Sequence, residues 1–199
     1  MKLFYTPGAC SLASHIVATE AGLPLTLERV DLRSKTTETG RDFNSVSVKG
    51  YVPALELDSG EILTEGTAVM QYLADLKPES GLAPANGTLA RYRLQEMLGF
   101  INSEVHKTYG AMFNPAMTPE ARENAIKLLH KRYGYIEAIL AHSPFLLGEQ
   151  FTAADAYLYT VTNWANYLKV DLSAFPQVLA YQQRIAARPG VQAAHKAES

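Results

Sequence analysis

Cys10 is the only cysteine in this chain of 199 residues, and it lies where thiol chemistry could occur. It follows a short apolar segment and the turn Thr6-Pro7-Gly8, at the predicted start of a helix. Unpaired backbone N–H groups at a helix start favour an anion, so the pKa of a thiol there can fall below its free value of about 8.5. A small buried side chain is the equally common role of a free cysteine. The lack of a second cysteine excludes a dithiol pair, an intrachain disulfide and a structural zinc site.

Two short motifs could bind a ligand through the backbone and a carboxylate. Pro53 opens a predicted strand, and a cis Val52–Pro53 bond would present the backbone N–H and C=O of Val52 to a ligand chain, although trans bonds are far commoner. Glu65 and Gly66 precede a predicted helix, where Gly66 allows close approach to the backbone and Glu65 could pair with a ligand amine. Ordinary helix capping is the simpler explanation of this second motif.

Four other polar side chains could act on a bound thiol or carboxylate. His106 could act on a thiol and Lys107 could neutralise a carboxylate, late in a long predicted helix; surface or core positions are the alternative. Tyr5 and Ser11 flank the first turn, and each could donate a hydroxyl hydrogen bond to an anion. Strand packing and an ordinary helix start are their alternatives.

The hydrophobic pattern indicates which elements position these residues. The first 80 residues predict the order βαβ then ββα, with a parallel pair and a right-handed crossover in the first unit. The expected strands are 2–5, 25–30, 52–57 and 61–63, and the expected helices are 11–21 and 67–76. Later residues are helical throughout, with helices at 88–109, 118–141 and 152–167 and a last helix that begins at Pro176 and that Arg188-Pro189-Gly190 ends.

A segment at 77–87 holds two prolines and two glycines and is the best candidate for a domain boundary. We therefore expect domains at 1–80 and 87–199. Thr152 to Asp155 is typical of a capping box, with Asp155 in the place of the usual Glu or Gln, which assigns Asp155 to folding.

Charge and composition exclude several classes of partner. Lys and Arg number 18 and Asp and Glu 20, so the net charge is −2 and no basic surface for nucleic acid is expected. No apolar run approaches the ~20 residues of a membrane span. Pro7 and Gly8 interrupt the first apolar stretch before it reaches the length of a secretory signal, so a cytoplasmic location is expected.

Taken together, these motifs resemble a glutathione transferase of the bacterial beta class, over essentially the whole chain. The resemblance rests on the segments 5–11, 50–55, 63–66, 104–107 and 151–155. It implies a thioredoxin-like βαβ–ββα domain at 1–80 that binds glutathione, and an all-helical domain at 87–199 that holds a small hydrophobic electrophile. It also implies glutathione as co-substrate, no metal, and a homodimer.

The resemblance also implies what each site residue does. In that class the cysteine lies beside the glutathione sulfur, the cis-proline strand holds the cysteinyl part, and the acidic residue with its neighbour holds the γ-glutamyl end. The expected glutathione-binding residues are Cys10, Lys35, Val52, Pro53, Glu65, Gly66, Ser103, Glu104, His106 and Lys107. The expected catalytic residues are Cys10, His106, Ser11 and Tyr5.

One position departs from the family pattern. Relatives often have Asn at Gly99, where its amide contacts glutathione, and a glycine cannot supply that group. Because a glycine inside a helix costs roughly 1 kcal/mol, we expect close packing or a pocket there. Ser103 stands where relatives often have Thr. The electrophile pocket is expected to include Tyr109, Met112, Phe113 and Trp164, with Pro115 and Tyr167 as further candidates and core packing as the alternative.

The expected reaction is attack of the glutathione thiolate on an electrophilic carbon. A thiol of pKa near 8.5 is only a few per cent ionised at neutral pH, and lowering its pKa by two units requires about 2.7 kcal/mol of thiolate stabilisation. No candidate is an obvious essential general base. The alternatives are glutathione-dependent thiol–disulfide exchange or reductive dehalogenation through Cys10, and a non-catalytic ligand-binding or interaction protein.

Overall fold

The computed structural model describes every residue from Met1 to Ser199. The chain forms two compact units: unit 1 contains Met1–Ala83 and Arg188–Ser199, and unit 2 contains Pro84–Ala187. The change between them falls inside the segment 77–87 that the prolines and glycines mark. None of the helices combines the length and the apolar composition that a membrane span requires.

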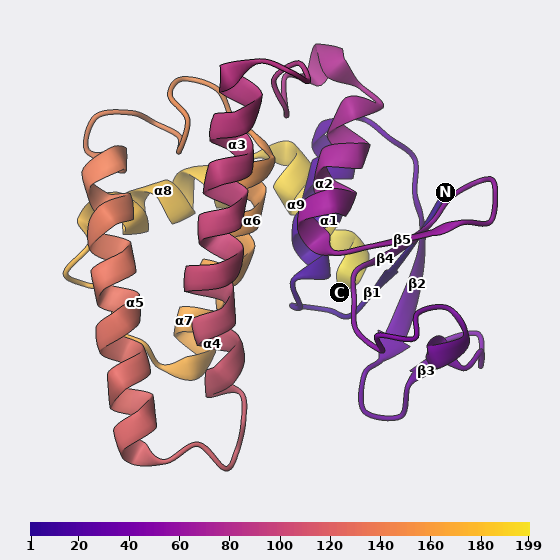
Figure 1. Cartoon of the computed structure of the whole chain (residues 1–199), viewed down its shortest axis with the longest axis horizontal. Coiled ribbons are helices and arrows are strands. Elements are labelled where there is room, and N and C mark those ends of the chain that lie inside the picture. Colours follow the sequence, from indigo (N-terminus) through magenta and orange to yellow (C-terminus); the bar gives the residue numbers. More distant parts are fainter. The chain divides into compact units, whose positions relative to one another are not determined.

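Unit 1 is built on a mixed sheet of five strands in the order β3-β2-β1-β4-β5 (Figure 1). β1 (Lys2–Tyr5) pairs in parallel with β2 (Thr26–Asp31) and antiparallel with β4 (Ala54–Glu56). β5 (Ile62–Thr64) and the two-residue β3 (Thr36–Thr37) pair antiparallel at the edges. The predicted βαβ–ββα order and its parallel first pair are therefore confirmed, and β3 is an addition.

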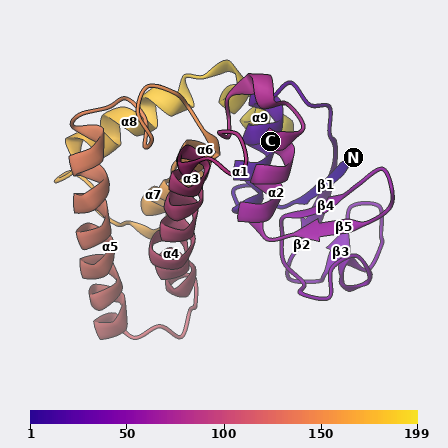
Figure 2. The same cartoon turned by 45° about the horizontal axis from the view of Figure 1, so that its top comes forward.

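Both faces of the sheet are covered, because alternate residues of the central strands are buried on opposite sides. Phe4 packs in one cluster with Phe43 and Val52, beside the short 3-10 helix η1 (Phe43–Ser45). Leu3 and Leu55, which point to the other side, are fully buried as well. α1 (Ser11–Glu20) and α2 (Gly66–Asp75) pack together beside the sheet, with the last helix of the chain next to α1 (Figure 2).

That last helix, α9 (Pro189–Glu198), was not predicted from the sequence. The sequence pattern predicts that Pro189 ends a helix, but Pro189 stands in the first turn of a new helix, where its missing N–H costs nothing. α9 belongs to unit 1, although the expected division placed its residues with the helical half. His15 Nδ1 lies 2.9 Å from the buried Glu198 Oε1, and Thr19 Oγ1 donates to Gly190 O at 3.0 Å.

Unit 2 is all-helical, as predicted. Its helices are α3 (Leu89–Phe100), α4 (Lys107–Met112), α5 (Pro119–Leu140), α6 (Ala153–Thr162), α7 (Trp164–Leu168) and α8 (Pro176–Ala186). A π-helical turn, η3 (Ile101–His106), joins α3 to α4 in one continuous rod. π-helical turns in α-helices are frequent at functional sites, and this one contains three predicted site residues.

Asp155 is the most heavily bonded carboxylate of unit 2, and its predicted capping role is confirmed. Its Oδ2 accepts from the backbone N–H of Thr152 at 2.8 Å, and its Oδ1 accepts from Leu146 N at 2.9 Å and from Tyr181 Oη at 3.1 Å. The fully buried Asp155 thus ties the start of α6 to the preceding loop and to α8.

Replacing Asp155 by Ala should destabilise the protein by about 3 kcal/mol, since a helix cap and buried hydrogen bonds to a carboxylate are lost together. Denaturant unfolding of Asp155→Ala measures this, with Asp171→Ala as control because the Asp171 carboxylate accepts from Ser173 N in an exposed turn. Activity per folded molecule should be unchanged. Equal, small losses of unfolding free energy in Asp155→Ala and Asp171→Ala would contradict the structural role of Asp155.

Candidate functional site

A short segment of unit 1, Lys49–Pro53, contacts the predicted ligand-binding residues of that unit. The Val52–Pro53 bond is cis. Cys10 Sγ donates to the carbonyl oxygen of Val52 at 3.2 Å, across 42 residues of sequence. The ring of Pro53 lies beside Gly66, where an added Cβ would touch it at 3.7 Å. The first two predicted motifs therefore meet in space.

Lys35 reaches the same segment from the loop after β2. Its Nζ donates to the carbonyl oxygen of Gly50 at 2.6 Å. Gly50 has φ +66°, and a Cβ there would meet Asn44 Oδ1 at 3.3 Å and the Lys35 side chain at 3.6 Å. The ammonium of Lys35 is thus fixed at one point, and its remaining N–H groups can bind a carboxylate.

Glu65 contacts the segment from the other side. Tyr51 Oη donates to its Oε1 at 2.8 Å, and Lys49 Nζ donates to the same oxygen at 2.6 Å. These two hydrogen bonds lower the pKa of Glu65, so the carboxylate is ionised at neutral pH. Glu65 has a backbone φ of +68°, which residues other than glycine rarely adopt, and such backbone strain is concentrated at functional sites.

The environment of Cys10 differs from the sequence-based expectation. Burial raises the pKa of the Cys10 thiol to about 11, and this outweighs the lowering effect of the backbone N–H groups of Cys10 and Ser11. The thiol in the free protein is therefore protonated at neutral pH. The helix start favours an anion as expected, but the loss of water around the sulfur has the larger effect.

Ser11 and Tyr5 do not fit the donor roles predicted for them. Ser11 is fully buried, and its Oγ accepts from the backbone N–H of Thr6 at 3.2 Å, which braces the first turn. Tyr5 is buried at the end of β1, where burial raises the pKa of its phenol. The alternatives describe them better: Ser11 is an ordinary residue of a helix start, and Tyr5 packs in its strand.

In unit 2, His106 belongs to a small hydrogen-bonded group on η3 and α6. Its Nδ1 lies 2.6 Å from Tyr157 Oη, and Tyr157 Oη donates to Asn102 Oδ1 at 2.8 Å. With that proton committed to Asn102, the ring of His106 donates through Nδ1 and leaves Nε2 as an acceptor. Burial lowers the pKa of His106 to about 4, so the ring is neutral at pH 7.

A neutral His106 with an accepting Nε2 supplies neither positive charge nor a hydrogen-bond donor to a thiolate. The catalytic role expected of His106 therefore stays a prediction, and donation to a thiolate is not part of it in this form. The ring can accept a hydrogen bond from an S–H or N–H group. Its edge also packs against Trp164, with ring centroids 4.9 Å apart.

The other predicted residues of this rod have different surroundings. Glu104 forms an ion pair with Arg132 of α5, and Ser103 Oγ donates to Gly99 O at 3.0 Å. Lys107 is exposed. A Cβ at Gly99 would meet nothing within 4 Å, so of the two expected alternatives close packing is excluded and open space lies beside this glycine.

The predicted electrophile residues separate into a surface group and a core group. Phe113 packs edge-on against Trp164, with centroids 5.4 Å apart, and stacks on the exposed Tyr167 at 5.8 Å. Tyr109 is fully buried and its Oη lies 3.0 Å from Tyr133 Oη, while Met112 is almost fully buried. Only Phe113 and Tyr167 of these residues are exposed; Trp164 is buried like Tyr109 and Met112, so the pocket roles of these three residues stay predictions.

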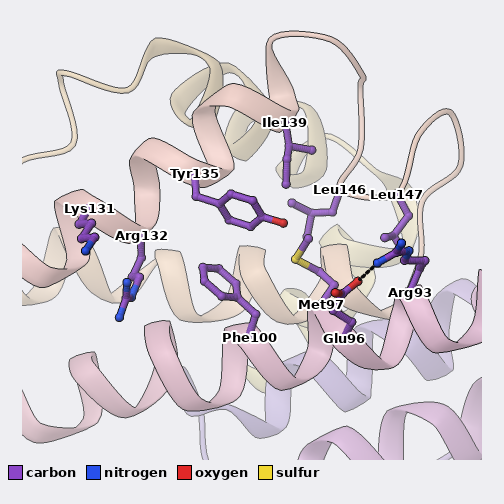
Figure 3. A pocket seen from close by; sticks show the side chains of 10 residues that line it. All are labelled: Arg93, Glu96, Met97, Phe100, Lys131, Arg132, Tyr135, Ile139, Leu146 and Leu147. Carbon is purple, nitrogen blue, oxygen red and sulfur yellow. Dashed lines mark hydrogen bonds and ion pairs between the residues drawn. The ribbon is translucent and has the colours of Figure 1, made fainter.

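Unit 2 also has a groove of about 530 Å³ that contains none of the predicted site residues (Figure 3). Phe100 of α3 and Tyr135 of α5 meet edge to face in it, with centroids 5.1 Å apart. Arg93 and Glu96 form an ion pair of 2.8 Å at one end. Apolar rings with charged residues around them are typical of a surface that binds protein.

Four contributors to these arrangements were not singled out from the sequence: Lys49, Tyr51, Asn102 and Tyr157. The i, i+4 spacing of Asn102 and His106 could have indicated a shared helix face. Lys49 and Tyr51 carry no such signal, because their partner Glu65 lies 14 to 16 residues further on. The structure also shows no group of three or more His, Cys, Asp or Glu side chains that could hold a metal ion.

Comparison with known proteins gives consistent matches along the chain. Residues 8–76 match the glutathione S-transferase N-terminal domain, and residues 100–189 match the C-terminal domain. The glutathione S-transferase GstA of Escherichia coli O157:H7 is 45% identical, over 100% of this chain and 98% of that protein.

Two solved structures are similar over their full length. A sphingomonad glutathione S-transferase complexed with glutathione has a TM-score of 0.96 and 46% identity, over 100% of this chain and 98% of the other. A bacterial beta-class glutathione S-transferase of Sphingomonas chungbukensis has a TM-score of 0.96 and 45% identity, over 100% and 99%.

The raised pKa of Cys10 predicts slow alkylation. Iodoacetamide reacts with the thiolate, so labelling at pH 7 should be at least about tenfold slower than for a cysteine in an unfolded peptide. The rate should keep rising with pH toward about 11. Mass spectrometry reads this at one site, because Cys10 is the only thiol. Fast labelling that levels off near pH 7 would show that the helix start outweighs burial.

Proposed function

Because the chain belongs to the glutathione S-transferase family, and within it to the bacterial beta class, we propose that it conjugates glutathione to small hydrophobic electrophiles. The observation that carries the proposal is the set of contacts around Lys49–Pro53. That segment brings a thiol, an ammonium and a carboxylate from distant parts of unit 1 to one stretch of backbone.

These groups suit the charges of glutathione. The tripeptide has a carboxylate at its glycyl end and both an ammonium and a carboxylate at its γ-glutamyl end. Lys35 binds the glycyl carboxylate, the backbone of Val52 pairs with the cysteinyl part, and Glu65 binds the ammonium. Backbone N–H groups of α2, which starts at Gly66, attract the γ-glutamyl carboxylate.

The reaction needs no protein nucleophile. The glutathione thiol loses its proton to solvent, and the N–H groups at the start of α1 stabilise the thiolate. The sulfur then attacks an electrophilic carbon with its electron pair, a C–S bond forms, and a leaving group such as halide departs with the pair of the broken bond. Phe113, Trp164 and Tyr167 provide apolar surface for the electrophile.

The roles of His106, Lys107, Ser103 and Glu104 in binding glutathione rest on the family resemblance. We propose the first two as contacts to the tripeptide, with His106 accepting a hydrogen bond in its neutral form. Glu104 is a weaker candidate because its carboxylate is paired with Arg132. Among the rival activities, exchange or dehalogenation through Cys10 should be slower than conjugation, because the Cys10 thiol stays protonated at neutral pH.

We also propose a cytoplasmic homodimer. The groove between Phe100 and Tyr135 supports self-association, because large exposed apolar side chains such as Tyr92 and Leu89 extend the same surface along α3. Its rim carries both signs of charge, so opposite charges can face one another when this surface meets a second copy of itself. The molecular mass of the protein in solution tests the proposed dimer directly.

Calorimetry with glutathione tests the binding site. Glu65→Ala should weaken binding at least tenfold, or ~1.4 kcal/mol, since the ligand ammonium loses its counter-ion. Glu61→Ala removes the same charge from the exposed turn before β5 and serves as control. Equal affinities for both variants and the wild type would place the ammonium elsewhere, and no wild-type binding would overturn the proposed function.

Cys10→Ala should reduce glutathione-dependent disulfide exchange far more than conjugation to an aromatic halide. Exchange through the protein requires the Cys10 sulfur, whereas conjugation uses the sulfur of glutathione. We expect conjugation to stay within about tenfold of the wild type and exchange to fall on the order of a hundredfold. Loss of all conjugation with glutathione binding intact would make Cys10 an essential catalytic group.

A further inference from the structure

Glu65 already has a cationic partner before any ligand binds. Lys49 Nζ donates to Glu65 Oε1 at 2.6 Å and to Thr64 Oγ1 at 3.0 Å. Tyr51 Oη donates to the same carboxylate oxygen at 2.8 Å. Both protein donors therefore use Oε1, and Oε2 remains available to a ligand.

Lys49 presents to Glu65 the same chemical group as a ligand amine. An alkylammonium and the ammonium of an amino acid are both compact cations that donate N–H bonds to a carboxylate. A ligand ammonium on Glu65 either replaces Lys49 or lies within a few ångströms of it. In both cases the presence of Lys49 opposes binding, through a lost ion pair or through repulsion between like charges.

The neutral Tyr51 acts differently. Its hydroxyl holds Oε1 without repelling a cation, and it extends from the segment whose Val52 carbonyl bonds Cys10. Tyr51 thus keeps Glu65 oriented whether Lys49 is in place or not.

We propose that Lys49 is a built-in competitor for the ligand ammonium at Glu65, and that Tyr51 is the residue that positions this carboxylate. The proposal rests on the proposed function, in which Glu65 binds the γ-glutamyl ammonium. Lys49 then determines how strongly the site distinguishes ligands with this amine from ligands without it.

The exposure of the pair suits such a role. The side chains of Lys49 and Glu65 are 42% and 52% exposed. Exposed ion pairs contribute little to stability and are readily exchanged for another cation. Lys49 can therefore leave Glu65 without disturbing the fold, and the expected effect on affinity is about two- to fivefold.

The test compares two ligands on the full-length protein by calorimetry: glutathione, and an analogue in which hydrogen replaces the γ-glutamyl amino group. Lys49 attracts the carboxylates of both ligands equally, so the ratio of the two dissociation constants isolates its effect on the ammonium. Lys49→Met keeps the length of the side chain and removes the charge. It should raise the preference for glutathione over the analogue about two- to fivefold.

Tyr51→Phe should change the same ratio in the opposite direction by at least about threefold, because a less well-oriented Glu65 binds the ammonium less well. Lys77→Met is the matched control, since Lys77 lies in unit 1 and pairs with Glu79 at 3.7 Å. It removes the same charge and should leave the ratio unchanged. Thermal unfolding of all variants checks that the fold is intact.

An unchanged or lower preference for glutathione in Lys49→Met, with normal wild-type binding, would overturn this inference alone and make Lys49 a support of Glu65. An equal rise of this preference in Lys77→Met would show that the effect comes from the net charge of the protein, and it would overturn the inference as well. Absence of glutathione binding by the wild type would overturn the proposed function together with the inference.

Discussion

The hydrogen bond between the Cys10 thiol and the Val52 carbonyl links the start of α1 to the segment on which the site of unit 1 depends. The other residues of that segment extend the link: Gly50 accepts from Lys35, and Lys49 and Tyr51 hold Glu65. Five residues of irregular backbone thus fix a thiol, a cation and an anion relative to one another. The sheet and the starts of α1 and α2 could not by themselves arrange these charges for a tripeptide.

Burial has opposite consequences for the two groups that were expected to handle protons. It raises the pKa of the Cys10 thiol and lowers the pKa of His106, so each side chain is neutral at pH 7. Neither supplies charge to a thiolate. Stabilisation of the glutathione anion therefore falls to backbone N–H groups, whose dipoles are fixed by the fold and do not titrate.

The sequence was most informative where a local rule decides the structure. Thr152 and Asp155 form the predicted cap, and the order of strands and helices along the first 80 residues follows from the period of the hydrophobic residues. It was least informative where distant residues decide. Pro189 reads as a stop signal and instead opens α9, whose Glu198 pairs with His15 across 183 residues. The pKa of Cys10 depends on how much water its neighbours exclude, and its position at a helix start does not predict this.

Backbone amide chemical shifts on addition of glutathione test the central claim most directly, that the Lys49–Pro53 segment holds the tripeptide. The account predicts the largest changes at Val52, at Glu65 and Gly66, and at the start of α1, with saturation at one common affinity. The strand β2 should be unaffected. Changes confined to the groove between Phe100 and Tyr135, with none at Val52, would contradict it.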